Sequence, residues 1–360
     1  MRLRFLLSPA LALVCAAAAA APVGDAPGRV AQAVPVGDAL DRPALDARDP
    51  AHAVLLAAAQ AGPRVVAVGE RGLVLASDDG GRSWHQAPAP TSVSLTAVRF
   101  ADALHGFAVG HGGVVLATTD GGKRWTKKLD GRRIAQIELD AAKQSGDAAA
   151  LKSAERLVAD GPDKPLLDVW VLDAQRALVV GAYGIALATQ DGGATWTPWR
   201  ARLDNPKELH LYALRQRGEQ WLVAGEQGLL RLSTDGGRSF KRLATPYKGS
   251  FFTAELPADG EIVVAGLRGN VWRSADAGAS WTQIASPVPV SVTASAQRAD
   301  GSLVFVNQAG MVLGLQGAAL RPWPGQPLPP LNGVHVLGDG ALLALSIHGV
   351  RRIDAAGAAR

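Results

Sequence analysis

Five aspartates in nearly identical surroundings are the first candidates for chemistry in this chain. They are Asp79, Asp120, Asp191, Asp235 and Asp276. Each stands in a phrase close to S/T-x-D-x-G-x-S/T, and an aromatic residue closes each phrase: Trp84, Trp125, Trp196, Phe240 and Trp281. A carboxylate can act as an acid or base or bind a cation, but it can also accept backbone N–H bonds within its own turn. Copies spread around a fold cannot converge on one substrate, so we interpret these residues as structural turn motifs.

Basic side chains form a second group, which could bind carboxylates. Its members are Lys127, Lys128, Arg132, Arg133, Arg200 and Arg202, with Arg71 and Arg268 in separate glycine-rich turns. Arginine makes paired hydrogen bonds to carboxylates, so this group favours an acidic or C-terminal segment of a partner protein. Trp199 is a candidate apolar anchor beside it. Such a cluster is also what an ordinary solvated surface carries.

Other kinds of site find little support in the residue types. The seven histidines show no ligand spacing, and the only cysteine is Cys15, so we expect no metal and no cofactor. No phosphate loop, serine nucleophile elbow or dinucleotide fingerprint is present. The formal net charge of +5 includes Arg2 and Arg4 of the leader described below, so it does not predict a nucleic-acid partner.

The segments that position these residues repeat along the chain. An apolar run broken by a V-x-G-x-x-G turn precedes each aspartate phrase, and the closing aromatic residues lie 41, 71, 44 and 41 positions apart. A period near 40 residues made of short strands predicts an all-β, seven-bladed β-propeller. Leu303–Val312 and Ala341–Arg352 supply the sixth and seventh copies. The seventh lacks its outer strand, and residues 30–48 are the candidate to complete it and close the ring.

The 71-residue interval contains a helical insertion at about 130–164, between blades 2 and 3. Ala148–Ala159 places Leu151, Ala154, Leu157 and Val158 on one stripe, which predicts an amphipathic helix. Arg133–Lys143 is a candidate second helix, separated from the first by Ser145-Gly146-Asp147. Long insertions in repeats are often functional. The insertion would overhang one face of the ring or pack only on its rim.

The two kinds of turn should lie on opposite faces of the ring. The V-x-G-x-x-G turn joins the second strand of a blade to the third, and the DGG turn joins the third to the fourth. The DGG turns are alike, whereas the other turns carry different side chains, including Arg71, His111, Tyr183 and Arg268. A constant frame with variable tips is typical of a binding surface. Single residues of such tips are also commonly just solvated.

The N-terminal 1–21 residues read as a secretory signal peptide. A basic start precedes an apolar run, and small residues at Ala18-Ala19-Ala20 offer a cleavage site. Lipid attachment at Cys15 is not expected, because Val14 is a poor residue before a lipidated cysteine. We expect an exported, periplasmic, monomeric protein without a membrane span, with residues 22–50 as an N-terminal segment and 51–357 as the propeller.

The repeated turns resemble Asp-box (BNR) repeats. The whole unit, V-x-G-x-x-G followed by S-x-DGG-x-x-W, resembles the Ycf48/HCF136 family of photosystem II assembly or stability factors over residues 51–357. The resemblance implies a seven-bladed propeller that binds a partner protein, aids assembly of a membrane protein complex and catalyses nothing. Some relatives without a photosynthetic role are associated with resistance-nodulation-division type exporters, so an accessory or sensor role there is an alternative.

A carbohydrate-active propeller, sialidase-like or lectin-like, is the other alternative. Sialidases need a tyrosine nucleophile paired with a glutamate beside three arginines. Tyr183 stands in a V-x-G-x-x-G turn, and Glu70 and Glu226 stand in turns of the same type. The F/Y-R-I-P phrase of sialidases is absent. A hydrogen bond from the hydroxyl of Tyr183 to either glutamate would favour the enzyme.

Overall fold

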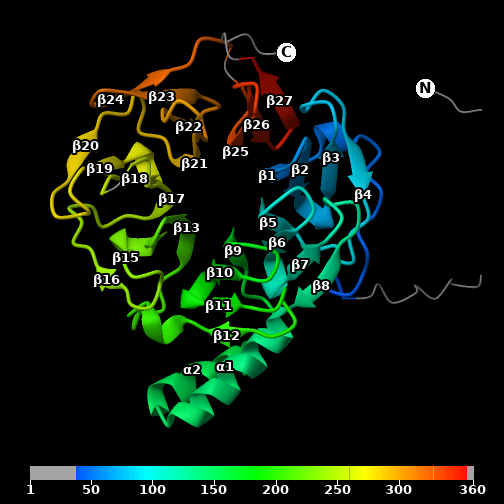
Figure 1. Ribbon diagram of the computed structural model, residues 1–360, viewed down its shortest axis with the longest axis vertical. Helices are drawn as coiled ribbons and strands as arrows, with labels where there is room; N and C mark the ends of the chain where they lie inside the picture. The colour runs from blue at the N-terminus through cyan, green and yellow to red at the C-terminus, as the bar shows by residue number, and fades with distance from the viewer. Residues whose placement is uncertain (1–37, 259, 327, 355–360) are drawn as a thin grey trace, which may run out of the picture. The chain divides into compact units, whose positions relative to one another are not determined.

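Seven antiparallel sheets surround a central axis, and each sheet is one blade of a β-propeller (Figure 1). The computed structural model describes residues 38–258, 260–326 and 328–354. Six blades have four strands, and the last has three among the described residues. Within each blade the strands pair in chain order, with the first strand innermost (Figure 1). The predicted seven-bladed, all-β propeller with a helical insertion is confirmed.

The first four blades contain the following strands. Blade 1 has β1 (Leu55–Ala61), β2 (Arg64–Gly69), β3 (Val74–Ser77) and β4 (His85–Ala87). Blade 2 has β5 (Leu95–Phe100), β6 (Gly106–Gly110), β7 (Val115–Thr118) and β8 (Thr126–Leu129). Blade 3 has β9 (Leu166–Val171), β10 (Ala177–Gly181), β11 (Ala186–Thr189) and β12 (Thr197–Pro198). Blade 4 has β13 (Leu211–Arg217), β14 (Gln220–Gly225), β15 (Leu230–Ser233) and β16 (Lys241–Arg242).

The remaining three blades complete the ring. Blade 5 has β17 (Phe251–Glu255), β18 (Ile262–Gly266), β19 (Val271–Ser274) and β20 (Thr282–Ile284). Blade 6 has β21 (Val292–Gln297), β22 (Leu303–Asn307), β23 (Val312–Gln316) and β24 (Ala319–Pro322). Blade 7 has β25 (Leu331–Val336), β26 (Leu342–Ser346) and β27 (Gly349–Ile353). The second strands are apolar runs because neighbouring blades cover them on both faces, and every residue of β6, β10, β18, β22 and β26 is buried.

Short 3-10 turns join the second and third strands of blades 1 to 5. They are η2 (Glu70–Gly72), η3 (His111–Gly113), η4 (Ala182–Gly184), η6 (Glu226–Gly228) and η7 (Leu267–Gly269). Two further 3-10 turns, η1 (Pro50–His52) and η5 (Arg200–Arg202), lie in connections. The central residue of each blade turn has a left-handed backbone, and a glycine follows it. At Gly72 a Cβ atom would come 2.0 Å from the Thr91 carbonyl oxygen, so no other residue fits there.

The repeated aspartates hold the turns between third and fourth strands. Asp79 Oδ1 accepts the backbone N–H groups of Arg82 and Ser83, each at 2.9 Å, and Trp84 Nε1 donates to the Gly81 carbonyl at 3.2 Å. Hydrogen bonds from the Thr195 hydroxyl and amide lower the pKa of Asp191 to about 2. In blades 2 to 5 the equivalent carboxylates also accept amides of their own turns. The five carboxylates therefore serve five separate blades and form no shared site.

The ring closes by packing between its first and last blades. Leu345 of β26 packs against Leu55 and Leu75 of blade 1, and Asn332 Nδ2 donates to the Leu55 carbonyl at 3.0 Å. The expectation that residues 30–48 complete blade 7 is corrected for residues 38–48, which lie against blades 1 and 2 instead. Burial of Leu40 and ion pairs of Asp38 and Asp41, described below, hold them there. Residues 30–37 lie outside the described part of the chain.

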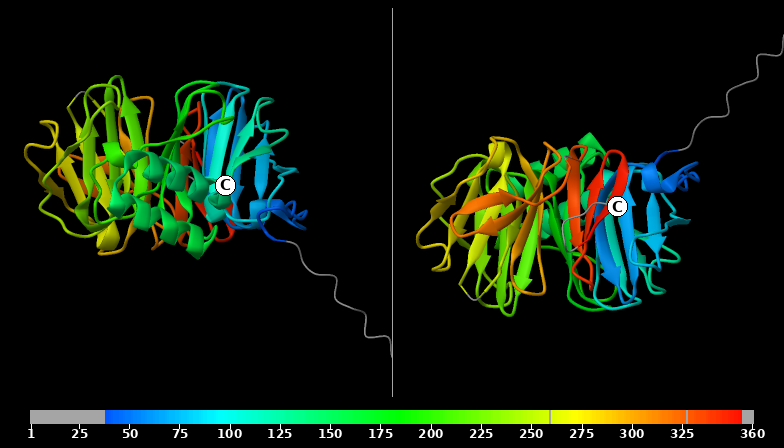
Figure 2. Two further views of the ribbon diagram at one scale, coloured as in Figure 1. Left: turned by 90° about the horizontal axis from the view of Figure 1, so that it is seen from below. Right: turned by 90° about the horizontal axis from the view of Figure 1, so that it is seen from above.

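Two antiparallel helices form the insertion, α1 (Gly131–Ser145) and α2 (Ala148–Asp160). Asp130 and Asp147 cap their N-termini, and Gly146 takes the left-handed conformation between them. The helices lie along the outer edge of the ring beside β12 (Figures 1 and 2). Ile134 and Leu157 join the apolar core of blades 2 and 3, whereas Val158 of the predicted stripe is 46% exposed. The insertion packs on the rim and also reaches the turn of blade 3.

Candidate functional site: the turn face

One face of the ring carries the variable turns and the connections between blades, and we call it the turn face. Amides of the turns donate to these connections, as Glu70 N–H does to the Val54 carbonyl (3.2 Å) and His111 N–H to the Ser94 carbonyl (2.9 Å). The DGG turns lie at the other ends of the same strands, where Gly121 N–H donates to Leu104 (3.0 Å). Antiparallel pairing therefore separates the two kinds of turn as predicted.

The tips of the turn face present side chains from unusual backbone positions. Arg71, Tyr183, Gln227 and Arg268 have φ of 56°, 55°, 54° and 57°. This left-handed conformation costs a non-glycine residue about 1 kcal/mol or more and is often found at functional sites. Arg71 and Arg268 are exposed, and no ion pair reaches either guanidinium group from the described residues. Two free positive charges are thus available on this face, with His111 also exposed.

Aromatic side chains form a continuous track across the turn face from blade 3 to blade 5. The ring centroids of Tyr183 and His210 lie 5.0 Å apart, those of His210 and Tyr212 6.2 Å, and those of Tyr212 and Phe252 5.2 Å. All three contacts are edge-to-face, the arrangement that aromatic rings prefer. Tyr183 is 44% exposed, and the other three rings are half-buried. We call these four residues the aromatic track.

Fixed hydrogen bonds hold the outer end of the aromatic track. The Tyr183 amide donates to Nδ1 of His210 at 2.9 Å, so the neutral ring carries its proton on Nε2. The His210 amide in turn donates to Oε2 of Glu226 at 3.2 Å. Burial is the main cause that raises the pKa of Tyr212, and the nearby charge of Glu226 adds to it. Sequence reasoning missed His210, Tyr212 and Phe252, although the last two share one repeat position, the second residue of an inner strand.

The geometry expected of a sialidase is not present among the described residues. Glu226 accepts the His210 amide, and no hydrogen bond joins the hydroxyl of Tyr183 to Glu70 or Glu226. Instead the Tyr183 ring packs on His210, and the Lys164 ammonium group lies 5.0 Å from its centroid. No group of three or more potential metal ligands occurs in the described ranges. No helix in the described part is long and apolar enough to cross a membrane.

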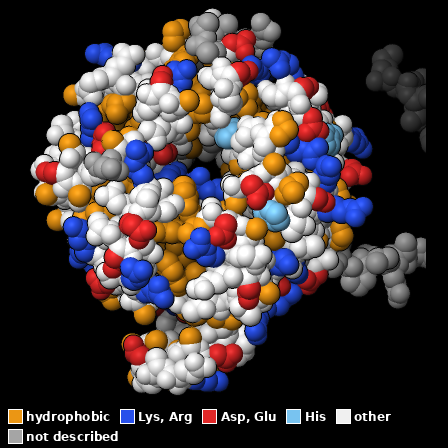
Figure 3. Space-filling view, viewed as in Figure 1, with side chains coloured by type: hydrophobic (Ala, Val, Ile, Leu, Met, Phe, Trp, Pro, Cys, Tyr) orange, Lys and Arg blue, Asp and Glu red, His pale blue; other side chains and the backbone are white. Residues whose placement is uncertain are grey.

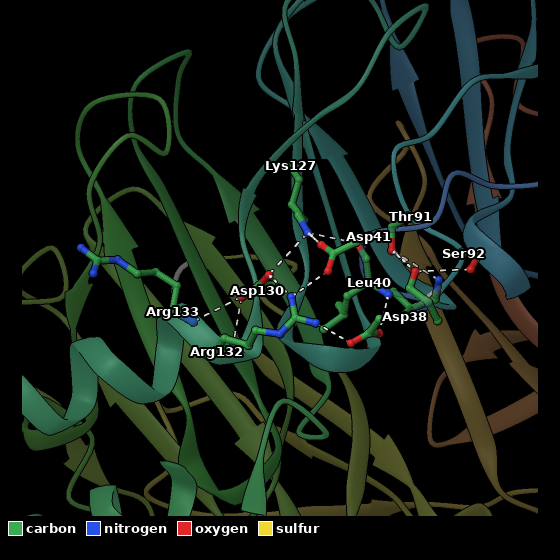
Figure 4. A network of polar contacts seen from close by, with 11 residues as sticks. Asp38, Leu40, Asp41, Thr91, Ser92, Lys127, Asp130, Arg132 and Arg133 are labelled. Atoms are coloured by element: carbon green, nitrogen blue, oxygen red, sulfur yellow. Dashed lines mark hydrogen bonds and ion pairs between the residues drawn. The ribbon is translucent and has the colours of Figure 1, made fainter. Parts of the chain in front are cut away.

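The predicted basic cluster is largely neutralised within the chain itself. Lys127 Nζ lies 2.5 Å from Asp41 Oδ1, and Arg132 pairs with both Asp38 and Asp41 (Figure 4). Asp130 lies 3.4 Å from Lys127. The hydrogen bond from Lys127, followed by that from Arg132, lowers the pKa of Asp41. Lys127 and Arg132 therefore already have carboxylate partners within the chain.

Two other members of the cluster have different roles: Arg200 joins the insertion to blade 3, and Arg202 donates to the Gly237 carbonyl of blade 4 at 3.3 Å. Arg200 donates to the Tyr183 carbonyl and to Glu208, both at 2.9 Å, and lies 4.0 Å from Glu138 of α1. The Arg202 guanidinium lies 4.5 Å from the centroid of Trp199.

The candidate anchor Trp199 belongs to the framework as well. Its ring packs half-buried beside Trp221 and Phe240, so it is not an open contact site.

Lys128 and Arg133 are exposed without ion pairs in the described residues, and neither belongs to a blade turn of the turn face. A Cβ atom on Gly193, in the DGG turn of blade 3, would meet Lys128 Cβ at 3.1 Å. Lys128 therefore lies beside the opposite face. Arg133 lies in the first turn of α1, beside the N-cap Asp130 (Figure 4). Of the predicted binding residues, the structure leaves Arg71, His111, Tyr183 and Arg268 available on the turn face.

A ring of charges that sequence reasoning missed lines the centre of the propeller. Arg99, Asp168, Arg215 and Glu255 come from the inner strands of blades 2 to 5 and alternate in sign. Asp168 lies 3.6 Å from Arg99 Nε and 2.8 Å from Arg215, whose Nε lies 3.6 Å from Glu255. Figure 3 shows basic side chains at the central hollow. The signal was a charged residue in each of four otherwise largely apolar inner strands, in the second half of the strand or, in β9, at its middle.

Comparisons with known proteins agree with this architecture. The family profile described as "Photosynthesis system II assembly factor YCF48" matches residues 81–149 and 149–323. The curated "Photosystem II assembly lipoprotein Ycf48" of Synechococcus sp. (strain CC9902) is 31% identical over 97 residues, which span 27% of this chain and 27% of that protein. The chain therefore matches about a quarter of that relative's length.

Solved structures share the fold at low sequence identity. The structure described as "YCF48 from Cyanidioschyzon merolae" is 17% identical with a TM-score of 0.61 and covers 84% of this chain and 95% of that one. The WD40 β-propeller domain of Doa1 is 11% identical with a TM-score of 0.59 and covers 87% and 95%. These likenesses show the propeller architecture alone.

Proposed function

Because the chain belongs to the photosynthesis system II assembly factor YCF48 family, we propose that it is a non-catalytic propeller that binds a partner protein and aids assembly of a membrane protein complex. The matched curated relative is named as a photosystem II assembly lipoprotein, which supports a client of this kind. The propeller supplies a rigid platform, and its turn face supplies the contact.

The observation that carries this proposal is the aromatic track, together with a free guanidinium group in the turn of the blade where the track ends. The track reaches blade 5 at Phe252, and the turn of the same blade presents Arg268. Exposed aromatic rings give large contact areas at low entropic cost, and arginine binds carboxylates in paired fashion. An extended acidic or C-terminal segment with at least one apolar side chain fits this surface.

The test uses substitutions to glycine, which the left-handed positions accept without strain. Tyr183→Gly and Arg268→Gly remove the contact groups and leave the turns intact. Ala277→Gly is the matched control, because Ala277 has φ 55° in the Asp276-Ala277-Gly278 turn, which replaces the DGG turn in blade 5 on the opposite face. Each full-length variant is used to capture partners from native membranes. We expect Tyr183→Gly and Arg268→Gly to lose the partner that wild type and Ala277→Gly retain.

If wild type, Tyr183→Gly, Arg268→Gly and Ala277→Gly all capture the partner equally, the assignment of binding to the turn face is overturned. An accessory role beside an exporter of the resistance-nodulation-division type would use the same surface and a different partner. The identity of the captured proteins distinguishes the two roles. We further propose export to the periplasm through the leader at residues 1–21, which lies outside the described residues.

A further inference from the structure

Residues 38–48, which we call the strap, lie along blades 1 and 2. Residues 38–41 lie in a groove formed by β8, η3 and the start of α1, and residues 44–47 bond to β4 and the connection after it. Its anchor is Leu40, which is 3% exposed and packs with Val114 and Leu116 of blade 2. The Leu40 carbonyl accepts a hydrogen bond from Lys127 Nζ at 3.0 Å. Figure 4 shows the carboxylates of Asp38 and Asp41 directed at the basic groups of β8 and α1.

The turn of blade 2 is shaped to admit this leucine. Four of the five 3-10 blade turns carry a bulky side chain at the left-handed position, whereas blade 2 has Gly112. A Cβ atom on Gly112 would come 2.7 Å from Leu40 Cδ2. The missing side chain therefore creates the pocket that Leu40 fills.

The charges of the groove are balanced only while the strap is in place. Lys127 and Arg132 face three carboxylates, of which Asp38 and Asp41 belong to the strap and Asp130 to the groove itself. Without the strap, two cations would face one carboxylate beside an open apolar pocket. The empty groove would thus favour a segment with a leucine between two acids.

The strap is attached by contacts that can be released separately from the blades. It forms no strand. Its backbone bonds to the neighbouring connection are Ser92 N–H to Ala39 O (2.9 Å) and Ala44 N–H to Ala89 O (3.0 Å), and the Gln86 side-chain amide accepts from Ala47 N–H (2.8 Å) and donates to Leu45 O (3.0 Å). The side chains of Asp38, Asp41 and Arg132 are 50%, 53% and 44% exposed, so water and salt weaken their pairing. Elements with few buried contacts open before the core does.

We propose that this groove is a docking site for a short acid–x–leucine–acid segment of a partner protein. The strap fills it in cis through Asp38-Ala39-Leu40-Asp41 and competes with the partner. A tethered competitor acts at an effective concentration of about millimolar, so the partner segment binds well only after the strap is released. The site lies beside the blade 2 turn η3 and uses none of the aromatic track or Arg268.

The experiment measures binding of a fluorescent peptide with the sequence of residues 37–45, GDALDRPAL, to full-length protein by anisotropy. The released variant carries Asp38→Asn, Leu40→Ser and Asp41→Asn together. We expect it to bind the peptide at least about tenfold more tightly than wild type does. A peptide with serine in place of its first leucine should not bind, and adding Arg132→Glu to the released variant should remove most of the binding.

Two results would overturn the proposal. One is a folded released variant that does not bind the peptide, and the other is equal binding by wild type. If the triple variant does not fold, hydrogen exchange in Arg132→Gln decides instead. We expect the Ser92 amide to lose protection there while amides of β6 keep theirs. If the Ser92 amide and the β6 amides lose protection together, the strap opens only when the blades unfold, and the proposal is overturned. Client capture through Arg268 is measured separately, so the two proposals fail independently.

Discussion

Replacing Asp168 by asparagine tests the charge ring at the centre of the propeller. Asp168 is 6% exposed, and its carboxylate accepts hydrogen bonds from the amides of Val169 and Leu214 at 2.9 Å each and from the Arg215 guanidinium at 2.8 Å. Asparagine carries no charge, so after this change Glu255 is the one remaining carboxylate of the charge ring beside Arg99 and Arg215. Removing one member of a buried ion pair costs about 3–5 kcal/mol, because the remaining charge stays desolvated. We therefore expect a loss of about that size in the free energy of unfolding.

Urea unfolding followed by tryptophan fluorescence and circular dichroism measures this loss. Asp173→Asn is the control, since Asp173 pairs with Arg176 at the surface, with side chains 43% and 58% exposed. Such a pair contributes about 0–1 kcal/mol. In the Asp168→Asn, Arg99→Met double variant, part of the loss should be recovered, because Arg99 is the cation whose ion pair is with Asp168, whereas Arg215 keeps Glu255. A loss under about 1 kcal/mol for Asp168→Asn, equal to that of the control, would refute the reasoning.

The remaining predictions concern titration, packing and processing. Burial raises the pKa of Glu138 to about 7, against a partial lowering by Arg200. An acid whose pKa is raised on folding stabilises the fold at low pH and loses that effect as pH rises through the folded value, so melting temperature should fall between pH 5 and 8 in wild type and less in Glu138→Gln. Trp199→Ala should lower stability by about 1.5–3 kcal/mol and leave partner capture by the remaining folded protein unchanged, because the half-buried ring packs against the core between blades 3 and 4. Mass spectrometry of the mature protein should show cleavage near Ala21 without lipid, whereas a lipidated Cys15 would contradict the expected processing.

The blades and the insertion could be predicted from the sequence because their signals are local. Each DGG phrase supplies its own turn hydrogen bonds, and Asp130, Asp147 and Gly146 mark the ends of the two helices. These features depend on residues a few positions apart. A repeat of such local units also fixes the number of blades.

The basic cluster could not be interpreted from the sequence because its partners are far away along the chain. Lys127 lies 86 positions from Asp41, and Arg132 lies 94 from Asp38. The same holds for the central charges, where Asp168 and Arg215 come from different blades 47 positions apart. Free and paired cations can be told apart only when the positions of these distant residues in the folded ring are known. The aromatic track was missed for the same reason.

Site-specific photo-crosslinking in native membranes tests most directly whether the turn face is the contact surface. A photoreactive phenylalanine analogue at position 183 should crosslink to a membrane protein partner. The same analogue at position 238, in the DGG turn of blade 4, should give no such product. Crosslinks from position 238 and none from position 183 would contradict the account.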